Sequence, residues 1–373
     1  MMPRPFPTRT AALLAWTLAA SSLTAQTRRE IQFPDPPGWR TLKCDFHVHT
    51  VFSDGLVWPT VRVDEAWRQG LDAIAITDHV EYQPHKADVP TNFNRSFELA
   101  AARGRERNLL VIRGAEITRE TPPGHFNALF LTDISPLKTD RLEDVFERAV
   151  GQGAFIFWNH PGWQGREKGQ WGPVQQLAFE RKQLHGIEIG NGETYYQEAH
   201  PWANERKLAL IGTSDIHDPA SDVPFSPEEH RTLTLVLARE RSLESIREAL
   251  FAGRTVVWWK NRLMGDERHL TALFGAAVQA RPIHHQTKDD FFVEIENHSE
   301  LNLELGRDDS AYGRPRVLKA RAVTLLRLPH KRLDATKSHV TFQVQNLLTA
   351  PDRPLEVRLP IPPQPASRPA GQK

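Results

Sequence analysis

The chain has 373 residues, more than one compact domain usually spans, so its length predicts about two domains. Its 47 basic and 46 acidic residues leave a formal net charge of +1, which excludes bulk electrostatic attraction to nucleic acid or to an anionic membrane. Cys44 is the only cysteine, so an intrachain disulfide and a thiolate-rich zinc site are excluded too. Histidine, by contrast, occurs 16 times and makes imidazole the abundant metal-binding group.

The first 25 residues have the composition of a targeting segment. Arg4 and Arg9 precede an apolar run over 11–20, and small residues follow over 21–25. This run is shorter than the ~20 apolar residues of a membrane-spanning helix, which favours a cleaved signal peptide over an uncleaved anchor. We therefore expect a periplasmic or extracellular protein, a linker over 26–42, and no stable membrane insertion once the signal is removed.

From Lys43 onward, short apolar runs alternate with helical patterns, as in repeated βα units around a parallel sheet or barrel. The last of these helices is predicted to begin after Ser242, a suitable N-cap, and to stop at Gly253. The predicted strands of this part are 45–50, 73–79, 110–118, 126–132, 154–160, 186–190 and 209–214.

A second domain is predicted where the texture of the sequence changes, near residue 260. The segments DDFFVEIENHSELNLELGR, SHVTFQVQNLL and RPLEVRLPI alternate apolar and polar residues, which is typical of half-buried antiparallel strands. We expect a small β-sandwich-like C-terminal domain over 261–360 that serves in packing or docking. The proline-rich remainder, 361–373, is predicted to be a disordered tail.

The segment DFHVHTVFSDG, residues 45–55, carries the strongest chemical signal. Side chains alternate faces along a strand, so Asp45, His47 and His49 point one way while Phe46 and Val48 point the other. Ionisable groups on an inward face cost several kcal/mol unless each is paired or coordinated. Imidazole with carboxylate is a ligand set of divalent transition metals, so the pattern favours a metal site over structural histidines.

Further candidate ligands lie at the ends of other predicted strands. The carboxyl ends of parallel strands converge on one rim of a βα architecture, where ligands and catalytic groups collect. His125 is the exception, because it opens its predicted strand. Together with Asp54, the candidates are His79, Glu116, His125, His160, Asp215 and His217.

The motifs HVHTVFSDG, ITDH, GAE, NHP and GTSDIH occur in this order and resemble the signature segments of the PHP (polymerase and histidinol phosphatase) family of metal-dependent phosphoesterases. The resemblance covers roughly 43–260 and implies an α/β fold, a distorted (β/α)7 barrel of PHP type. An exported domain of this kind followed by a β-rich domain looks most like the Sb-PDE-type phosphodiesterases.

The resemblance also implies two or three divalent metal ions, with manganese, zinc and iron as candidates. By matching motifs, the first ion would be held by His47, His49, Glu116 and Asp215. The second would be held by Glu116 as a bridge, His125 and His160, and the third by Asp54, His79 and His217. Asp45 would lie behind the ligating imidazoles and orient them.

A metal pair activates a water as hydroxide and clamps the phosphoryl oxygens, so this chemistry needs no nucleophilic side chain. The catalytic roles fall to Asp215, which would accept a proton from the water, and to His217, which would donate one to the leaving alkoxide. The candidates for substrate contacts are Arg119, Arg95, Lys86, Asn191 and Trp163, with solvated or structural positions as the competing interpretation.

The predicted function is that of an exported metal-dependent phosphoesterase that hydrolyses phosphodiesters of small organic alcohols. A phosphomonoesterase of the same fold is the alternative among enzymes, because only the pocket walls separate the two reactions. A metal-binding or docking surface protein without catalysis is the alternative from another class. The near-neutral charge disfavours a nucleic-acid substrate, and the sequence predicts neither the natural substrate nor the oligomeric state.

Overall fold

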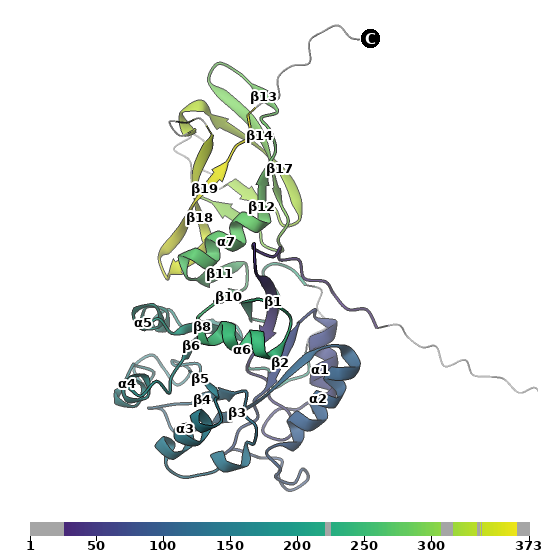
Figure 1. Ribbon diagram of the computed structural model, residues 1–373, viewed down its shortest axis with the longest axis vertical. Coiled ribbons are helices and arrows are strands. Elements are labelled where there is room, and N and C mark those ends of the chain that lie inside the picture. The colour runs from purple at the N-terminus through teal and green to yellow at the C-terminus, as the bar shows by residue number, and fades with distance from the viewer. Residues whose placement is uncertain (1–25, 221–224, 307–315, 334–335, 337, 364–373) are drawn as a thin grey trace, which may run out of the picture.

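The computed structural model describes residues 26–220, 225–306, 316–333, 336 and 338–363. The predicted signal peptide and all but the first three residues of the predicted tail lie outside these ranges. The α/β part and the β-rich part follow one another along the long axis of the molecule (Figure 1). No helix of the described ranges has the length and apolar character needed to cross a membrane.

A curled sheet forms the centre of the α/β part, with strand order β9-β1-β2-β3-β4-β5-β6 and β8 beside β6. The strands β1, β2 and β3 pair in parallel, as do β5, β6 and β8. Two strands are reversed: β4 is antiparallel to β3 and β5, and β9 is antiparallel to β1. The strand bounds are β1 (Arg40–Asp45), β2 (Ala73–Ile76), β3 (Leu110–Ile117), β4 (Phe126–Leu129), β5 (Phe155–Trp158), β6 (Gly186–Asn191), β7 (Thr194–Tyr195), β8 (Ala209–Thr213), β9 (Leu233–Ala238) and β10 (Thr255–Trp259).

The curled sheet closes on itself by packing where β8 meets β9 and β10. The hydroxyl of Thr234 on β9 accepts from the backbone N–H of Gly212 on β8 at 2.9 Å and donates to its carbonyl at 2.8 Å. A Cβ atom at Gly212 would lie 2.4 Å from Cγ1 of Val257 on β10. Glycine therefore permits a close approach that any side chain at this position would prevent.

Helices surround the outside of this sheet (Figure 1). Their starts follow local rules: Pro59 stands at the first position of its helix, and the Ser242 side chain accepts from the backbone N–H of Ser245 at 3.1 Å. The second contact confirms the predicted N-cap. The helices are α1 (Pro59–Arg68), α2 (Arg95–Arg107), η1 (Ser135–Leu137, a 3-10 turn), α3 (Leu142–Gly151), α4 (Pro173–Glu180), α5 (Ala199–Arg206) and α6 (Leu243–Phe251).

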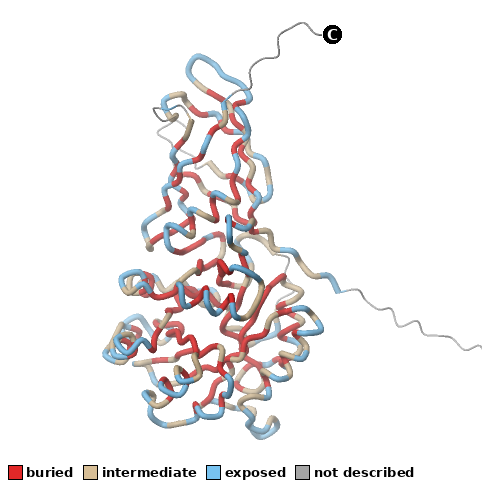
Figure 2. Tube along the Cα trace, in the orientation of Figure 1, coloured by how far each residue is buried: buried red, intermediate tan, exposed pale blue. Residues whose placement is uncertain are grey.

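The β-rich part is a sandwich of two sheets, as predicted. Its central strand β14 (Asp290–Asn297) alternates buried and half-buried side chains, as the sequence pattern indicates. The inner faces of both sheets share one hydrophobic core, visible as buried segments in Figure 2. The other elements are β11 (Arg262–Gly265), α7 (Glu267–Ala277), β12 (Val278–Ala280), β13 (His285–Gln286), β15 (Leu303–Leu305), β16 (Arg316–Leu318), β17 (Ala322–Pro329), η2 (His330–Arg332, a 3-10 turn), β18 (His339–Ala350) and β19 (Arg353–Pro360).

One hydrogen-bonded ladder connects the two parts. The strand β11 pairs antiparallel with β10 of the curled sheet and parallel with β18 of the sandwich. The hydrophobic core that contains Trp258 of β10 also contains Phe291 of β14. The two parts are therefore joined by main-chain pairing and by shared packing.

The predicted strand 45–50 differs from the observed one, because β1 ends at Asp45 and the following residues run as an extended loop. Here a side chain replaces a backbone partner from the neighbouring strand, because the Thr77 hydroxyl accepts a hydrogen bond from the Val48 backbone N–H at 2.9 Å. Beyond Asp45, an isolated parallel bridge joins Val48 to Ile216, and the Thr77 backbone N–H donates to the Val48 carbonyl at 3.0 Å. The alternation itself holds, since Phe46 and Val48 are fully buried in hydrophobic clusters while His47 and His49 face the carboxylates of Glu116 and Asp215.

Candidate metal centre

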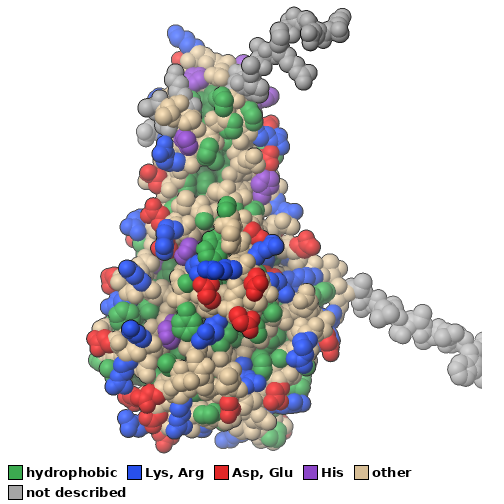
Figure 3. Space-filling model, in the orientation of Figure 1, with side chains coloured by type: hydrophobic (Ala, Val, Ile, Leu, Met, Phe, Trp, Pro, Cys, Tyr) green, Lys and Arg blue, Asp and Glu red, His purple; other side chains and the backbone are tan. Residues whose placement is uncertain are grey.

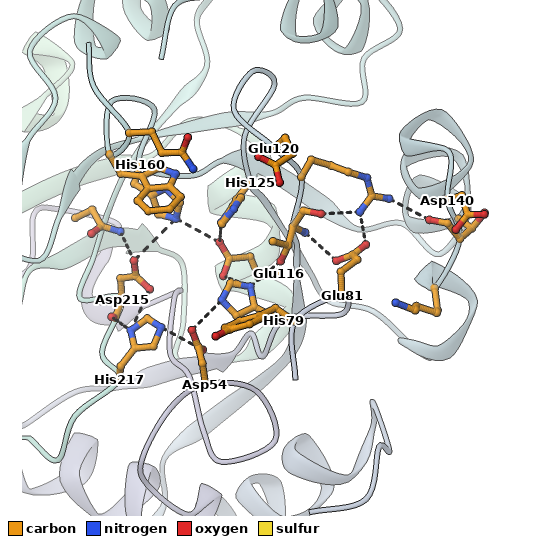
Figure 4. A pocket seen from close by; sticks show the side chains of 18 residues that line it. Asp54, His79, Glu81, Glu116, Glu120, His125, Asp140, His160, Asp215 and His217 are labelled. Atoms are coloured by element: carbon orange, nitrogen blue, oxygen red, sulfur yellow. Dashed lines mark hydrogen bonds and ion pairs between the residues drawn. The ribbon is translucent and has the colours of Figure 1, made fainter. Parts of the chain in front are cut away.

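One rim of the curled sheet gathers all nine predicted ligands, and Figure 4 shows seven of them, all except His47 and His49. The strand direction explains the exceptional position of His125. Because β4 runs antiparallel to β3 and β5, the start of β4 lies at the same rim as the carboxyl ends of its neighbours. His125 directly precedes β4 and so reaches Glu116 near the end of β3, with Nδ1 2.9 Å from Oε1.

Four atoms of the first predicted ligand set form a compact polyhedron. Nε2 of His47 lies 3.2 Å from both Oε2 of Glu116 and Oδ1 of Asp215. Nε2 of His49 lies 3.2 Å and 3.1 Å from the same two oxygens. Nitrogen and oxygen ligands lie about 2.0–2.2 Å from a transition-metal ion, so neighbouring ligand atoms about 3 Å apart are compatible with a shared divalent cation.

The same four atoms are buried and have no hydrogen-bond partner. Buried polar atoms without partners are rare in native proteins, because each costs about 1–3 kcal/mol. Here the two nitrogens and two oxygens lie within contact distance without hydrogen-bond geometry, as ligands do when they face a common point. Their arrangement therefore fits a divalent cation at that point.

The remaining ligands surround this set in two further groups. In one group, Oδ1 of Asp54 lies 3.2 Å from Nε2 of His217 and 3.5 Å from Nδ1 of His49. Its other oxygen lies 3.4 Å from Nε2 of His79. This arrangement agrees with the implied third set and adds His49 to it.

The implied second set is less clearly separated. His125 and His160 both approach Oε1 of Glu116, at 2.9 Å and 3.3 Å. By proximity, however, His125 also groups with His79 and Glu116, while His160 groups with His47 and Asp215. The structure thus brings the predicted residues together, and the division of ligands among ions stays a prediction.

The buried carboxylates of the cluster stabilise positive charge on the groups around them. Burial opposes the charged form of His47, but the carboxylates of Asp215, Glu116 and Glu188 outweigh it and raise the pKa of His47 well above its usual range. Burial likewise opposes ionisation of Glu116, yet the nearby imidazoles of His79 and His47 hold the pKa of Glu116 well below its usual range. Divalent cations would replace the protons that these imidazoles otherwise hold.

Asp45 has a different role from the predicted one. Its fully buried carboxylate contacts no imidazole nitrogen; Oδ1 accepts the backbone N–H groups of His47 at 3.3 Å and Ser214 at 3.1 Å, and Oδ2 pairs with Arg231 at 3.1 Å. Because β1 ends at Asp45, the side chain lies beside the loops and not behind the rings. It ties the His47 segment to the Ser214 segment through the backbone.

Glu188 of β6 orients the first imidazole instead. Its Oε1 lies 3.1 Å from Nδ1 of His47, and its Oε2 accepts from the backbone N–H of His160 at 2.7 Å and from Asn191 at 2.9 Å. A carboxylate behind a ligating imidazole fixes the ring and its tautomer. In the sequence, Glu188 lies near the end of the predicted strand 186–190, where either a supporting role beside the ligands or simple capping of the strand is expected.

Arg62 on α1 is a second supporting residue that the sequence did not reveal. Its side chain is fully buried, and its guanidinium donates to the backbone carbonyls of His49 at 2.8 Å, Ile216 at 3.2 Å and Asp218 at 2.7 Å. Glu65, one helical turn along, balances its charge at 2.9 Å. The arginine thereby holds together the two loops that present His49 and His217.

Two ligands have backbone conformations that are unusual for residues other than glycine. The φ angle is 51° at Asp215 and 23° at His160. Such conformations cost of order 1–3 kcal/mol and persist where the surroundings fix them. Hydrogen bonds do so here, since Asn191 binds the Asp215 carboxylate at 3.1 Å and Glu188 binds the His160 backbone.

A cavity of about 810 Å³ opens beside the ligands and contains three of the five predicted substrate contacts, Arg119, Asn191 and Trp163. The Arg119 guanidinium is already bound to residues of the cavity wall. It pairs with Glu81 and donates to the carbonyls of Thr118 and Thr139, at 2.7 Å and 3.0 Å. Lys86 and Arg95 do not line this cavity. Lys86 is exposed, and Arg95 pairs with Glu98 at 3.0 Å on the surface of α2.

Comparisons with known proteins agree with this geometry. A family model described as the PHP domain matches residues 45–153, and a model described as an Ig-like domain matches residues 278–360. A crystal structure from Bacteroides vulgatus, of a two-domain protein containing a predicted PHP-like metal-dependent phosphoesterase, is 44% identical in sequence. Its TM-score is 0.84, and the match covers 90% of this chain and 100% of that chain. The chain belongs to the PHP family.

Two other matches among solved structures are more distant. A candidate metal-dependent phosphoesterase from Bifidobacterium adolescentis is 17% identical, with a TM-score of 0.40 over 58% of this chain and 97% of that chain. An amidohydrolase from Chromobacterium violaceum, with bound sulfate and no metal, is 18% identical, with a TM-score of 0.38 over 49% of this chain and 90% of that chain. Among curated proteins no match was found.

Family membership and the ligand clusters together support a metal-dependent phosphoesterase of PHP type. The residues present fit metal ions, because the buried unpartnered atoms of the cluster, those of His47, His49, Asp54, Glu116, His160 and Asp215, are imidazole nitrogens and carboxylate oxygens. The Sb-PDE subtype, the metals and their number stay predictions.

Proposed function

We propose that this protein hydrolyses phosphodiesters of small organic alcohols. The observation that carries the proposal is the set of four buried, unpartnered ligand atoms of His47, His49, Glu116 and Asp215 beside a cavity of about 810 Å³. Divalent ions held there would lower the pKa of a water and neutralise charge on the phosphoryl oxygens. The face of the protein seen in Figure 3 mixes basic and acidic side chains, which supports a small substrate over a nucleic acid.

Hydrolysis forms a P–O bond from water and breaks the P–O bond to the alkoxide. One proton must leave the attacking water, and one must reach the departing alkoxide. Asp215 is positioned to take the first proton, because its carboxylate faces the cavity while Asn191 donates to its Oδ2 at 3.1 Å and fixes its orientation. Asn191 thus acts as a positioning residue.

His217 fits the role of a metal ligand better than that of the proton donor. Its Nδ1 lies 2.8 Å from the backbone carbonyl of Asp215, which accepts a hydrogen bond only when this nitrogen carries the proton. In the neutral ring Nε2 then has a free lone pair, and it lies 3.2 Å from Asp54 in the third ligand group. We expect His217→Asn to lower kcat/KM equally for esters with good and poor leaving groups. A much larger loss for poor leaving groups would restore the donor role.

The central test compares esters on purified protein reconstituted with manganese or zinc. We expect turnover of bis(p-nitrophenyl) phosphate that exceeds turnover of p-nitrophenyl phosphate and disappears on chelation. A preference for the monoester would support the phosphomonoesterase, which uses the same ligands. Inactivity toward both esters, with metal bound, would instead support a binding protein.

We also propose that residues 1–25 direct export and are removed. The arginine-flanked apolar run and the small residues after it support this proposal. N-terminal sequencing of the protein from the periplasm or the medium should give a chain that begins near residue 26. An intact N-terminus in the cytoplasmic fraction would contradict it.

A further inference from the structure

Two exposed aromatic rings flank the metal centre on different sides. Trp163 has an exposed fraction of 51%, and its ring centroid lies 5.6 Å from that of His125 and 5.8 Å from that of His160. Tyr82 has an exposed fraction of 53%, and its ring lies 5.8 Å from that of His79. Figure 4 shows His125 and His160 on one side of Glu116 and His79 on the other.

Structural packing does not account for these rings. Large aromatic side chains contribute to stability by burial, and half-exposed ones lose much of that contribution. Within the described ranges, neither the Tyr82 hydroxyl nor the Trp163 indole N–H hydrogen-bonds to another protein group. Four aromatic side chains there are about half exposed, and two of the four line the cavity that is also lined by seven of the nine predicted ligands.

The backbone holds both rings in place. The backbone N–H of Trp163 donates to the backbone carbonyl of His160 at 3.1 Å, which closes a turn directly after this predicted ligand. Before Tyr82, the Glu81 carboxylate accepts the backbone N–H of Thr118 at 2.9 Å and pairs with Arg119. Rings on fixed backbone bind a ligand with little loss of conformational entropy.

We propose that Trp163 and Tyr82 are specificity-determining residues, each of which receives one ester group of a phosphodiester with two flat or apolar groups. This inference rests on the proposed function and deepens it. A phosphoryl group at the ligand cluster has one ring toward His125 and His160 and the other toward His79, so a diester can use both rings and a monoester only one. The cavity volume of about 810 Å³ leaves room for both groups.

The test uses Trp163→Ala and Tyr82→Ala with Trp163→Phe and Tyr82→Phe as conservative partners. We expect each alanine variant to raise KM for bis(p-nitrophenyl) phosphate about tenfold, with kcat and metal content retained, and each phenylalanine variant to stay within about twofold. Methyl p-nitrophenyl phosphate has one flat group, so its KM should respond to one of the two alanine variants. The control is Phe251→Ala on α6, an exposed ring outside this cavity, which should leave KM unchanged.

Direct binding supplies a second measurement. Diphenylphosphinate resembles the diester but has phosphorus–carbon bonds that are not hydrolysed. Its calorimetric Kd should rise about tenfold in each alanine variant, while that of dimethylphosphinate should not change. Unchanged KM and Kd in both variants of an active enzyme would overturn this inference alone. A metal-loaded wild type that hydrolyses no diester would overturn the proposed function and this inference with it.

Discussion

Two buried polar sites, one in each part of the molecule, differ in their hydrogen bonding. In the β-rich part, Asn346 is 2% exposed, and its side chain donates to the carbonyls of Asn261 at 2.7 Å and Asn302 at 2.8 Å and accepts from the N–H of Glu304 at 3.0 Å. At the rim of the α/β part, the ligand atoms of His47, Glu116 and their neighbours have no such partners. Complete hydrogen bonding is typical of structure, whereas converging unpartnered atoms indicate a missing ligand.

The largest effect should follow substitution of the carboxylate that all the ligand groups approach. Glu116→Gln keeps the shape of the side chain but removes a charge that neighbours His47, His49, His79, His125 and His160. We expect activity to fall by more than about 100-fold, beyond the range for outer-shell partners, with loss of bound metal by elemental analysis. Full metal content with activity within tenfold of wild type would show that the unpartnered atoms of this cluster do not mark a metal centre that depends on Glu116.

Metal removal should destabilise the α/β part, since the cluster then holds buried charges without an ion. With free metal at about 1,000 times Kd, binding to the folded state alone adds about 4 kcal/mol to the free energy of unfolding. Calorimetry with chelator should therefore show a lower Tm, and added manganese or zinc should restore it. An identical Tm in both conditions would argue against a metal centre of this kind.

Glu188→Gln should have a smaller effect, because Glu188 acts through His47. The variant keeps the shape of the side chain but weakens the interaction at Nδ1 of the imidazole. We expect metal affinity to fall by about 10–100-fold, measured by titration against a competing chelator. Activity at saturating metal should recover substantially. If affinity stays the same, Glu188 serves only to hold the backbone of His160.

Asn346→Ala is the matched substitution in the β-rich part. It removes the side-chain partner of the Asn261 carbonyl and of the Glu304 N–H, while the Asn302 carbonyl keeps the Asn261 side chain as a donor at 3.0 Å. The free energy of unfolding should fall by about 1–3 kcal/mol, measured in urea. Metal content and kcat of the folded protein should not change. A loss of metal in this variant would show that the two parts are coupled more closely than their buried polar groups indicate.

Much of the site could be predicted because its chemistry is local in sequence. The alternation through His47 and His49 needs only the period of an extended chain, and the strand-end rule places Asp215 beside them. The strand-end rule also made Glu188 a candidate for a supporting role, but the choice between Asp45 and Glu188 as the partner of the His47 imidazole could not be predicted in this way. Which carboxylate meets an imidazole depends on where β1 stops and on how β6 lies next to its neighbours.

The role of Arg62 on helix α1 also could not be predicted from the sequence, because it depends on tertiary packing. In PTVRVDEAWR it has the appearance of a solvated charge, and nothing in the segment distinguishes it from Arg68. Only the packing of two distant loops over α1 gives its guanidinium carbonyl acceptors. The strands were easier to predict than the supporting residues, because six predicted strands correspond to β2, β3, β4, β5, β6 and β8 within a few residues at their ends. The closure of the sheet at Gly212 could not be predicted, because it depends on contacts between strands far apart in the chain.

The ladder through β11 has a practical consequence for dividing the molecule. A shortened chain that ends at Trp259 would leave the outer edge of β10 without its partner strand β11. Open strand edges of this kind recruit further strands from other molecules. The catalytic half on its own should therefore be prone to self-association.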